Sequence, residues 1–342
     1  MLTLDELIDP QAENLQNLLF QKIISKIRPS WELSTTKFHT FQDGITNKMY
    51  GIWHEENCDS IKNSKDGIVL RINGNGTENF IDRNKEIESW KILEDAGAAP
   101  KLFCVFGNGL CMQFVKGSTL TIDSIRDKTV SSKIAEHMAK CHSLDSENSV
   151  PGCYFFPEKF LKGAKQFPGK YTKEFLVNGY QKFKETLSLK SEVNKKLSFC
   201  HNDLLLGNVL YDSETGIVNF IDYEYAHMNF AGFDIANHFC EYTGLDVLDY
   251  EKYYPDLEHR KEFCKKYLVS RLEKDEVSEE MVNELVSDCE IMAISSHYFW
   301  GCWALMQADI SDIDFDYLNY AVQRFDEMCK IDAQIGLNNF NQ

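Results

Sequence analysis

Two neighbouring stretches, FCHNDLLLGNVLY (199–211) and NFIDYEYA (219–226), place polar and acidic residues inside runs of Phe, Leu, Val and Ile. Short apolar runs of this kind predict buried strands. Buried carboxylates are costly unless they are paired or bound to a metal. The two stretches therefore predict a site in which a partner or a cation compensates the polar groups of His201, Asp203, Asn208 and Asp222.

The spacing of these residues is informative. His201, Asp203 and Asn208 fit H-x-D-L-x-x-x-N, the catalytic-loop spacing of protein kinases. We expect Asp203 to orient an attacking hydroxyl and accept its proton, and Asn208 and Asp222 to hold Mg²⁺ against the phosphates of ATP. His201 is expected to be structural and to pin the loop. A capped turn with solvated side chains would explain the HxD pattern by itself, but it leaves Asn208 and Asp222 unexplained.

Composition narrows the range of partners. The chain has 342 residues, of which 43% are hydrophobic, and its formal net charge is −17. This is enough apolar sequence for a large core in one domain or two lobes. An acidic surface repels nucleic acid and anionic lipid, so neither is an expected partner. A small cationic substrate would suit this field.

The cysteines and the apolar segments favour a cytoplasmic protein without a membrane span. Eleven Cys are scattered without CxxC spacing, and HExxH is absent, which predicts reduced core thiols rather than disulfides or a zinc site. The N-terminus has no basic region followed by a long apolar run, so no secretory signal is expected. The segment 291–308 has no Asp, Glu, Lys or Arg, but it contains polar residues and lacks flanking Lys or Arg. We interpret it as a helix buried in a globular lobe.

The order of predicted elements indicates an α+β fold. A helix over 13–28 ends at Pro29, a hairpin over 37–55 turns at Asp43-Gly44, and a third strand covers 67–74. A helix over 83–97 and two strands over 99–115, turning at Asn108-Gly109, complete this part. Later come helices over 124–143 and 172–188, two strands around the turn 213–216, and long helical stretches. We predict a small β-rich nucleotide-binding lobe (1–112), a hinge (113–118) and a large, mostly helical catalytic and substrate-binding lobe (119–342), with a cleft between the lobes.

The first predicted lobe should bind ATP. Arg71 in the third strand takes the place of the kinase lysine that contacts the α/β-phosphates, and Glu86 is its expected ion-pair partner, with Glu88 as second choice. An ordinary salt bridge would look the same in the sequence. The segment QDGITNK lacks GxGxxG but would lie over the phosphates, and MQFVKG (112–117) would contact adenine. The expected nucleotide contacts in these two segments are Gly44, Thr46, Asn47, Lys48, Gln113 and Val115.

Three longer stretches resemble the ethanolamine/choline kinase family. They are CHNDLLLGNVLY (200–211), FIDYEYAHMNFAGFDIANHFCEY (220–242) and SHYFWGCWALMQADISDIDFDYLNYAVQRF (296–325), and the resemblance extends over about residues 40 to 328. It implies the protein-kinase-like, two-lobed fold and phosphorylation of an amino alcohol with MgATP. It also implies that Asp203 is the catalytic base, that Asn208 and Asp222 are the metal ligands, and that Asp234 braces the catalytic loop.

The same resemblance implies an ammonium site. Its expected members are Asp203, Tyr225, Glu241, Trp300, Trp303, Tyr317 and Tyr320. Trp300 and Trp303 are three residues apart, so they share a helix face, as do Tyr317 and Tyr320. Aromatic rings attract alkylammonium groups by cation–π interaction. A Trp pair at helical spacing is more often simple core, and only the match of the whole segment favours a cage.

Two details favour an ethanolamine kinase within the family. Choline kinases tend to have Gln where this chain has Leu205, and two Gly where it has Asp43-Gly44. The sequence DYE (222–224) replaces DFG, which argues against a protein-kinase-type flip of Asp222. The implied reaction forms phosphoethanolamine, the first step of the CDP-ethanolamine route to phosphatidylethanolamine. Choline, or an amino sugar as in aminoglycoside-type phosphotransferases, remains the alternative acceptor, and a binding scaffold without activity is disfavoured because the base and metal residues are all present. A homodimer is compatible with this interpretation.

Overall fold

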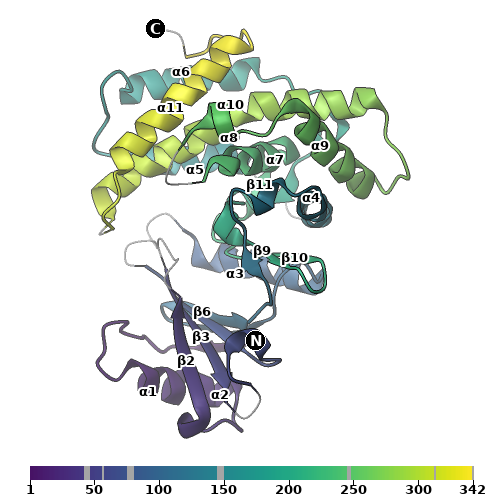
Figure 1. Cartoon of the computed structure of the whole chain (residues 1–342). Coiled ribbons are helices and arrows are strands. Elements are labelled where there is room, and N and C mark those ends of the chain that lie inside the picture. Colours follow the sequence, from purple (N-terminus) through teal and green to yellow (C-terminus); the bar gives the residue numbers. More distant parts are fainter. Residues whose placement is uncertain are drawn as a thin grey trace. The chain divides into compact units, whose positions relative to one another are not determined.

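A computed structural model of the chain describes residues 1–41, 47–55, 58–74, 81–144, 150–244, 248–311 and 313–340. The chain divides into two compact units, residues 1–118 with 210–221, and residues 119–209 with 222–342 (Figure 1). The first unit is built on a β-sheet and the second on helices. The predicted α+β class is therefore confirmed.

A six-stranded sheet forms the first unit, in the order β1-β5-β6-β4-β3-β2. Its strands are β1 (Leu2–Leu4), β2 (Thr36–Phe41), β3 (Lys48–His54), β4 (Ile68–Ile72), β5 (Leu102–Phe106) and β6 (Gly109–Gln113). Strands β2 and β3 pair antiparallel as the predicted hairpin, although its turn at residues 42–46 lies outside the described residues. Strands β5 and β6 turn at Asn108-Gly109 as predicted. An added Cβ at Gly109 would lie 2.1 Å from the carbonyl oxygen of Arg71, so the close approach of β4 requires glycine here.

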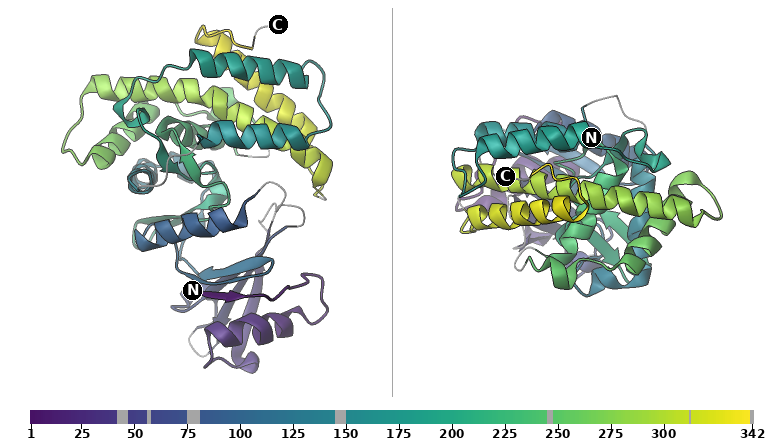
Figure 2. Two further views of the ribbon diagram at one scale, coloured as in Figure 1. Left: turned by 180° about the vertical axis from the view of Figure 1, so that it is seen from behind. Right: turned by 90° about the horizontal axis from the view of Figure 1, so that it is seen from above.

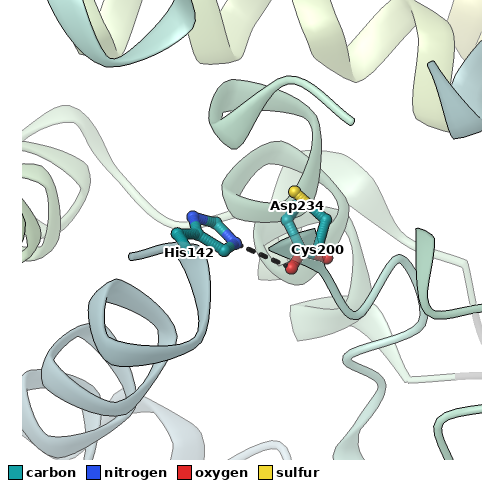
Figure 3. Close-up of side chains that lie close together, drawn as sticks. All are labelled: His142, Cys200 and Asp234. Carbon is teal, nitrogen blue, oxygen red and sulfur yellow. Dashed lines mark hydrogen bonds and ion pairs between the residues drawn. The ribbon is translucent and has the colours of Figure 1, made fainter. Parts of the chain in front are cut away.

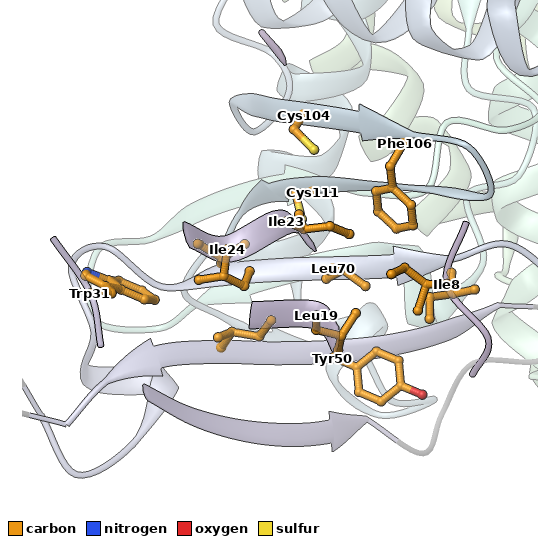
Figure 4. Packing of buried hydrophobic residues seen from close by; sticks show 13 residues of the cluster. Ile8, Leu19, Ile23, Ile24, Trp31, Tyr50, Leu70, Cys104, Phe106 and Cys111 are labelled. Carbon is orange, nitrogen blue, oxygen red and sulfur yellow. The ribbon is translucent and has the colours of Figure 1, made fainter. Parts of the chain in front are cut away.

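The predicted N-terminal helix is a continuous helical stretch made of α1 (Leu15–Leu19), a π-helical turn (Phe20–Ile24) and α2 (Ser25–Ile27). Figure 4 shows Leu19, Ile23 and Ile24 of this stretch packed over the sheet, next to Leu70 of β4. Helix α3 (Arg83–Asp95) begins at Asp82, whose carboxylate accepts two backbone N–H bonds of the first turn. These helices bury the apolar side chains of the sheet and fix β4 in the core.

Helices form most of the second unit. They are α4 (Lys128–His142), α5 (Gly152–Gly163), α6 (Lys173–Thr186), α7 (Ala231–Cys240), α8 (Tyr250–Tyr253), α9 (Leu257–Leu272), α10 (Glu279–Ile310) and α11 (Tyr317–Gln334). Helix α10 packs against α5, α7, α9 and α11, and Figure 2 shows α11 running alongside α10. The apolar segment 291–308 lies within α10, and most of its residues are buried. Among the described residues, no helix has the length and apolar character needed to span a membrane.

Short strands frame the two polar stretches. Strand β8 (Ser198–Cys200) pairs antiparallel with β11 (His227–Asn229). Strands β9 (Val209–Asp212) and β10 (Ile217–Phe220) turn at residues 213–216 as predicted, and they form a small sheet with β7 (Ser118–Thr119). Residues 201–208 therefore connect β8 to β9, and residues 221–226 connect β10 to β11. Both segments are loops whose ends are fixed by strands.

Candidate active site

Asp234 holds the loop that follows β8. It lies on α7 with 1% of its surface exposed, and its carboxylate accepts the backbone N–H groups of His201 at 2.8 Å and Asn202 at 2.7 Å. Nε2 of His142 lies 3.0 Å from the same carboxylate. Burial by itself would raise the pKa of Asp234, but the hydrogen bond and charge of His142, with the contribution of His201, lower it below its ordinary value. Asp234 therefore stays charged and anchors the loop backbone.

Asn202 fixes the other side of the loop. Its φ of 67° lies in the left-handed region, which Asn tolerates better than most residues. Its Nδ2 donates to the carbonyl of Tyr225 at 2.9 Å, and its Oδ1 accepts from Nδ2 of Asn229 at 2.8 Å. A strained backbone that is held from several sides is common at functional sites. The side chain of Asn202 thereby ties the loop at 201–208 to the loop at 221–226.

Asp203 and Asn208 are direct neighbours. Nδ2 of Asn208 donates to the Asp203 carboxylate at 3.0 Å and to the Asp203 carbonyl at 2.8 Å. Burial raises the pKa of Asp203 well above its ordinary value, and the charges of Asp222, Glu241 and Glu224 raise it further. Three carboxylates of the second unit therefore repel the charge of Asp203. A cation bound nearby would offset this repulsion, which is what the predicted metal site requires.

The donor set fits Mg²⁺. The amide nitrogen of Asn208 donates to Asp203, so its oxygen is the atom that would bind a metal. Asp222 follows β10 in the left-handed conformation, with φ of 64°, and its carboxylate is the second predicted ligand. Oxygen donors of this kind suit a hard cation that also keeps water or phosphate ligands.

His201 contacts the backbone of the loop. Its Nδ1 accepts the backbone N–H of Asp203 at 3.3 Å, and its ring lies 5.0 Å from that of Tyr223, measured between ring centres. These contacts fit a structural role, and the role that we predicted for His201 stays a prediction.

The five predicted cage rings form one cluster around Trp303. Its Nε1 donates to the hydroxyl of Tyr225 at 2.9 Å, and its ring centre lies 5.5 Å from Trp300, 5.7 Å from Tyr317 and 6.5 Å from Tyr320. The ring centres of Tyr225 and Trp300 are 5.4 Å apart. All these pairs meet at steep angles between 71° and 75°, so the rings pack edge to face rather than stack.

Three residues of this region were missed from the sequence. Arg324 of α11 is 1% exposed and donates from Nη1 to Glu241 at 3.2 Å and to the hydroxyl of Tyr320 at 3.2 Å. Arg324 follows Tyr320 by four residues, and that helical spacing was the available signal. Phe315 lies 4.9 Å from Tyr317 between ring centres, and Glu224 is a buried carboxylate whose charge acts on Asp203.

The carboxylate of Glu241 is therefore already paired. Burial raises the pKa of Glu241, and the charge and hydrogen bond of Arg324 counteract this only in part. A buried carboxylate with a raised pKa gains from a second cation nearby. The charge of Glu241 acts on Asp203 together with those of Asp222 and Glu224, so this part of the described structure carries further negative charge.

The predicted nucleotide residues belong to the first unit. Arg71 forms a buried ion pair with Glu86, and Nη1 of Arg83 donates to the same carboxylate at 2.8 Å. Glu88, the second choice for this pair, is exposed. Oδ1 of Asn47 accepts from the backbone N–H of Gly74 at 3.2 Å.

The remaining nucleotide residues make fewer described contacts. Lys48 begins β3 and is exposed, Gln113 ends β6 and is exposed, and Val115 is half-buried. Gly44 and Thr46 lie outside the described residues. Their assignment to the nucleotide stays a prediction.

A third cluster, His142, Cys200 and Asp234, has the composition of a metal site (Figure 3). Its potential ligand atoms lie within 4.8 Å of one another. The carboxylate of Asp234, however, already accepts two backbone N–H bonds and the contact from His142, while Nδ1 of His142 lies 2.7 Å from the hydroxyl of Tyr267. The structure explains this cluster as the brace of the catalytic loop.

Comparison with known proteins places this site in a family. The family model described as choline/ethanolamine kinase matches residues 38–329. This chain belongs to the choline/ethanolamine kinase family. A probable ethanolamine kinase of Nematostella vectensis is 38% identical over 339 residues, covering 94% of this chain and 93% of that protein. Ethanolamine kinase 2 of Mus musculus is 36% identical over 322 residues, covering 92% of this chain and 81% of that protein.

Solved structures of choline/ethanolamine kinases share the fold. Plasmodium vivax ethanolamine kinase matches with a TM-score of 0.76 at 21% identity, covering 94% of this chain and 92% of its own. Choline kinase from Cryptosporidium parvum matches with a TM-score of 0.77 at 22% identity, covering 95% and 96%. The predicted protein-kinase-like fold is therefore confirmed, and so is the predicted family.

Proposed function

We propose that this member of the choline/ethanolamine kinase family transfers the γ-phosphoryl group of ATP to the hydroxyl of ethanolamine, giving phosphoethanolamine and ADP. One observation carries the proposal. A kinase-type loop with Asp203 and Asn208 lies in the same compact unit as a cluster of aromatic rings that includes Trp303 and a buried carboxylate, Glu241. The curated relatives named as ethanolamine kinases support the choice of acceptor.

The acceptor amine is bound by charge and by ring faces. At neutral pH the ethanolamine nitrogen is an ammonium with three N–H donors. Glu241 offers a carboxylate, and the rings of Tyr225, Trp300, Trp303, Tyr317 and Tyr320 offer faces that attract a cation. Holding the ammonium there confines the hydroxyl, two carbons away, to a narrow range of distances from the anchored nitrogen.

Asp203 is the proposed base. Its carboxylate accepts the proton of the hydroxyl as the oxygen attacks the γ-phosphorus, and the bond to the β,γ-bridging oxygen breaks to release ADP. The hydrogen bond from Asn208 holds the carboxylate in place. Mg²⁺, held by Asn208 and Asp222, would neutralise the phosphate charge. In the first unit, Gly44, Thr46, Asn47, Lys48, Arg71, Gln113 and Val115 are proposed to contact the nucleotide, with Glu86 orienting Arg71.

The product suits the route to phosphatidylethanolamine by way of CDP-ethanolamine, and we propose that the enzyme acts there, in the cytoplasm. Choline is the competing acceptor, because an aromatic cluster also accommodates a trimethylammonium group. Choline has no N–H donor for Glu241, and its three methyl groups need more room. We therefore propose that ethanolamine is the better substrate.

A coupled ADP-release assay with ethanolamine, with choline and with no acceptor tests the proposal. We expect a higher kcat/KM for ethanolamine than for choline and little ADP release without an amine. ³¹P NMR should detect phosphoethanolamine in equimolar amount to the ADP formed. A choline advantage would make the protein a choline kinase. A rate of ADP release that neither amine increases would contradict an amino-alcohol acceptor.

A further inference from the structure

Asn237 contacts the catalytic loop and the aromatic cluster at once. It lies on α7 with none of its surface exposed. Its Nδ2 donates to the carbonyl oxygen of Asn202 at 3.3 Å. Its Oδ1 accepts from Nε1 of Trp300 at 2.7 Å and from the hydroxyl of Ser296 at 2.8 Å. One buried amide therefore joins the loop before Asp203 to a ring of the proposed ammonium site.

The contact to Asn202 acts on the peptide group that leads into Asp203. This group is held at both ends, because Asn237 bonds its carbonyl oxygen and Nδ1 of His201 bonds its N–H, which belongs to Asp203. Asn202 is in the left-handed region, with φ of 67°, so the group lacks the support of regular secondary structure. The orientation of this peptide group therefore depends on these two side chains.

The hydrogen bonds continue to the carboxylate of the ammonium site. The hydroxyl of Ser296 also accepts from Nη2 of Arg324 at 3.1 Å, and Nη1 of Arg324 donates to Glu241 at 3.2 Å. Glu241 and the four residues that link it to the loop, Arg324, Ser296, Asn237 and Asn202, are at most 5% exposed. Buried hydrogen-bonded networks of this kind fix positions because each unpaired member would be costly.

We propose that Asn237 is a positioning residue that holds the ammonium site in register with the base, Asp203. This inference rests on the proposed function, in which the ammonium anchors the acceptor and Asp203 takes the proton of its hydroxyl. In a two-carbon alcohol only rotation about one C–C bond changes the distance between the anchored nitrogen and the reacting oxygen, so this distance varies little. The enzyme must therefore keep the separation of Trp300 and Asp203 within a narrow range, and Asn237 bonds both Trp300 and the peptide group before Asp203.

Asn237→Asp is the main test variant. It keeps the shape and the oxygen that accepts from Trp300 and Ser296, but it replaces the donor to Asn202 with a second acceptor. We expect kcat with ethanolamine to fall about 10- to 100-fold, the loss that a small misplacement of a catalytic group produces. We expect KM for ATP to change less than about threefold.

Trp300→Phe and Trp303→Phe provide a matched pair. Each keeps a ring and removes one indole N–H, but the N–H of Trp300 serves Asn237 whereas that of Trp303 serves Tyr225. We expect Trp300→Phe to lower kcat and Trp303→Phe to raise KM for the amine instead. The double variant Asn237→Asp/Trp300→Phe should be no slower than Asn237→Asp alone.

Hydrogen exchange gives a readout that does not depend on turnover. We expect the backbone N–H groups of His201, Asn202 and Asp203 to exchange faster in Trp300→Phe than in wild type, and to be unchanged in Trp303→Phe. Two results would overturn the coupling. One is unchanged exchange in Trp300→Phe, and the other is a double variant whose loss of kcat equals the product of the losses in Asn237→Asp and Trp300→Phe. If wild type phosphorylates neither ethanolamine nor choline, the proposed function fails, and the exchange result alone decides whether Asn237 couples the two sites.

Discussion

Arg324 and Glu241, 83 residues apart in sequence, form a buried ion pair in which Nη1 lies 3.2 Å from Oε1. The guanidinium is 1% exposed, and it also contacts Tyr320 and Ser296. Removing one member of such a pair leaves the other charge buried without compensation, at a cost of about 3–5 kcal/mol. Variants of Glu241 must therefore keep an oxygen for Arg324 if they are to report on the amine.

Glu241→Gln is expected to raise KM for ethanolamine about tenfold and to leave KM for ATP nearly unchanged. The amide oxygen still accepts from Arg324, but the negative charge that attracts the ammonium is lost. Trp303→Ala should also raise this KM, by about 2- to 30-fold for one cation–π contact. Steady-state kinetics with each substrate varied in turn checks both. A raised KM for ATP with an unchanged KM for the amine would show that Glu241 and Trp303 do not bind the amine and serve only to pack the core.

Asp203→Asn should lower kcat by about 10²–10⁴, because the amide cannot accept the hydroxyl proton. Since Asn keeps an oxygen for the bond from Asn208, the loop should retain its geometry and ATP should still bind. Single-turnover kinetics and nucleotide titration measure the two effects separately. Near-normal turnover would exclude Asp203 as the base.

Asp222→Ala is expected to weaken Mg²⁺-dependent nucleotide binding about tenfold or more, and Asp222→Asn, which keeps one oxygen, should have a smaller effect. Activity should disappear with a chelator and return with Mg²⁺ or Mn²⁺. Asp212→Ala is the control, because Asp212 ends β9 on the hairpin that precedes Asp222, and its side chain accepts a hydrogen bond from Thr215. Nucleotide affinity that is equal in all these variants would rule out Asp222 as a metal ligand.

The sequence was sufficient wherever the chemistry is local. Asp203 and Asn208 lie five residues apart on one loop, so their spacing by itself made them candidates, and the turn at Asn108-Gly109 was specified by its own residues. Partners that only the tertiary fold brings together were missed. Arg324 reaches Glu241 across the helical unit, and the parallel pairing of β1 with β5 joins Leu2 to Cys104. The sequence of one helix indicates which residues share a face, but it does not indicate which residues of other elements pack against that face.

Asp234→Asn should reduce the free energy of unfolding by about 2–5 kcal/mol at pH 7, because one of the N–H donors that face the carboxylate would lose its acceptor. The folded pKa of Asp234 is lowered, so its stabilising contribution is complete above about pH 4, the unfolded value, and is lost as the pH falls through the folded value. Urea unfolding of wild type and Asp234→Asn at pH 7 and near pH 3 should show that the difference in their free energies of unfolding is smaller in acid. A difference that is the same at both pH values would show that the charge of Asp234 does not stabilise the loop.

Gly301→Ala should destabilise the protein and weaken amine binding together. Gly301 lies on α10 between Trp300 and Trp303, and an added Cβ would lie 2.4 Å from the ring of Phe325 on α11. Because Tyr317, Tyr320 and Arg324 of the proposed ammonium site lie on the same helix as Phe325, pushing α11 away would separate them from the Trp rings. We expect a loss of about 1–3 kcal/mol in the free energy of unfolding and a raised KM for the amine.

Gly163→Ala is the matched control for this change. Its added Cβ would lie 3.3 Å from the flexible side chain of Met306, so we expect no loss of stability beyond about 0.5 kcal/mol. Urea unfolding curves and amine kinetics on both variants make the comparison. If Gly301→Ala loses stability with an unchanged KM for ethanolamine, the packing of α11 on α10 does not position the ammonium site, and the rings are held by their own contacts to Tyr225 and Asn237.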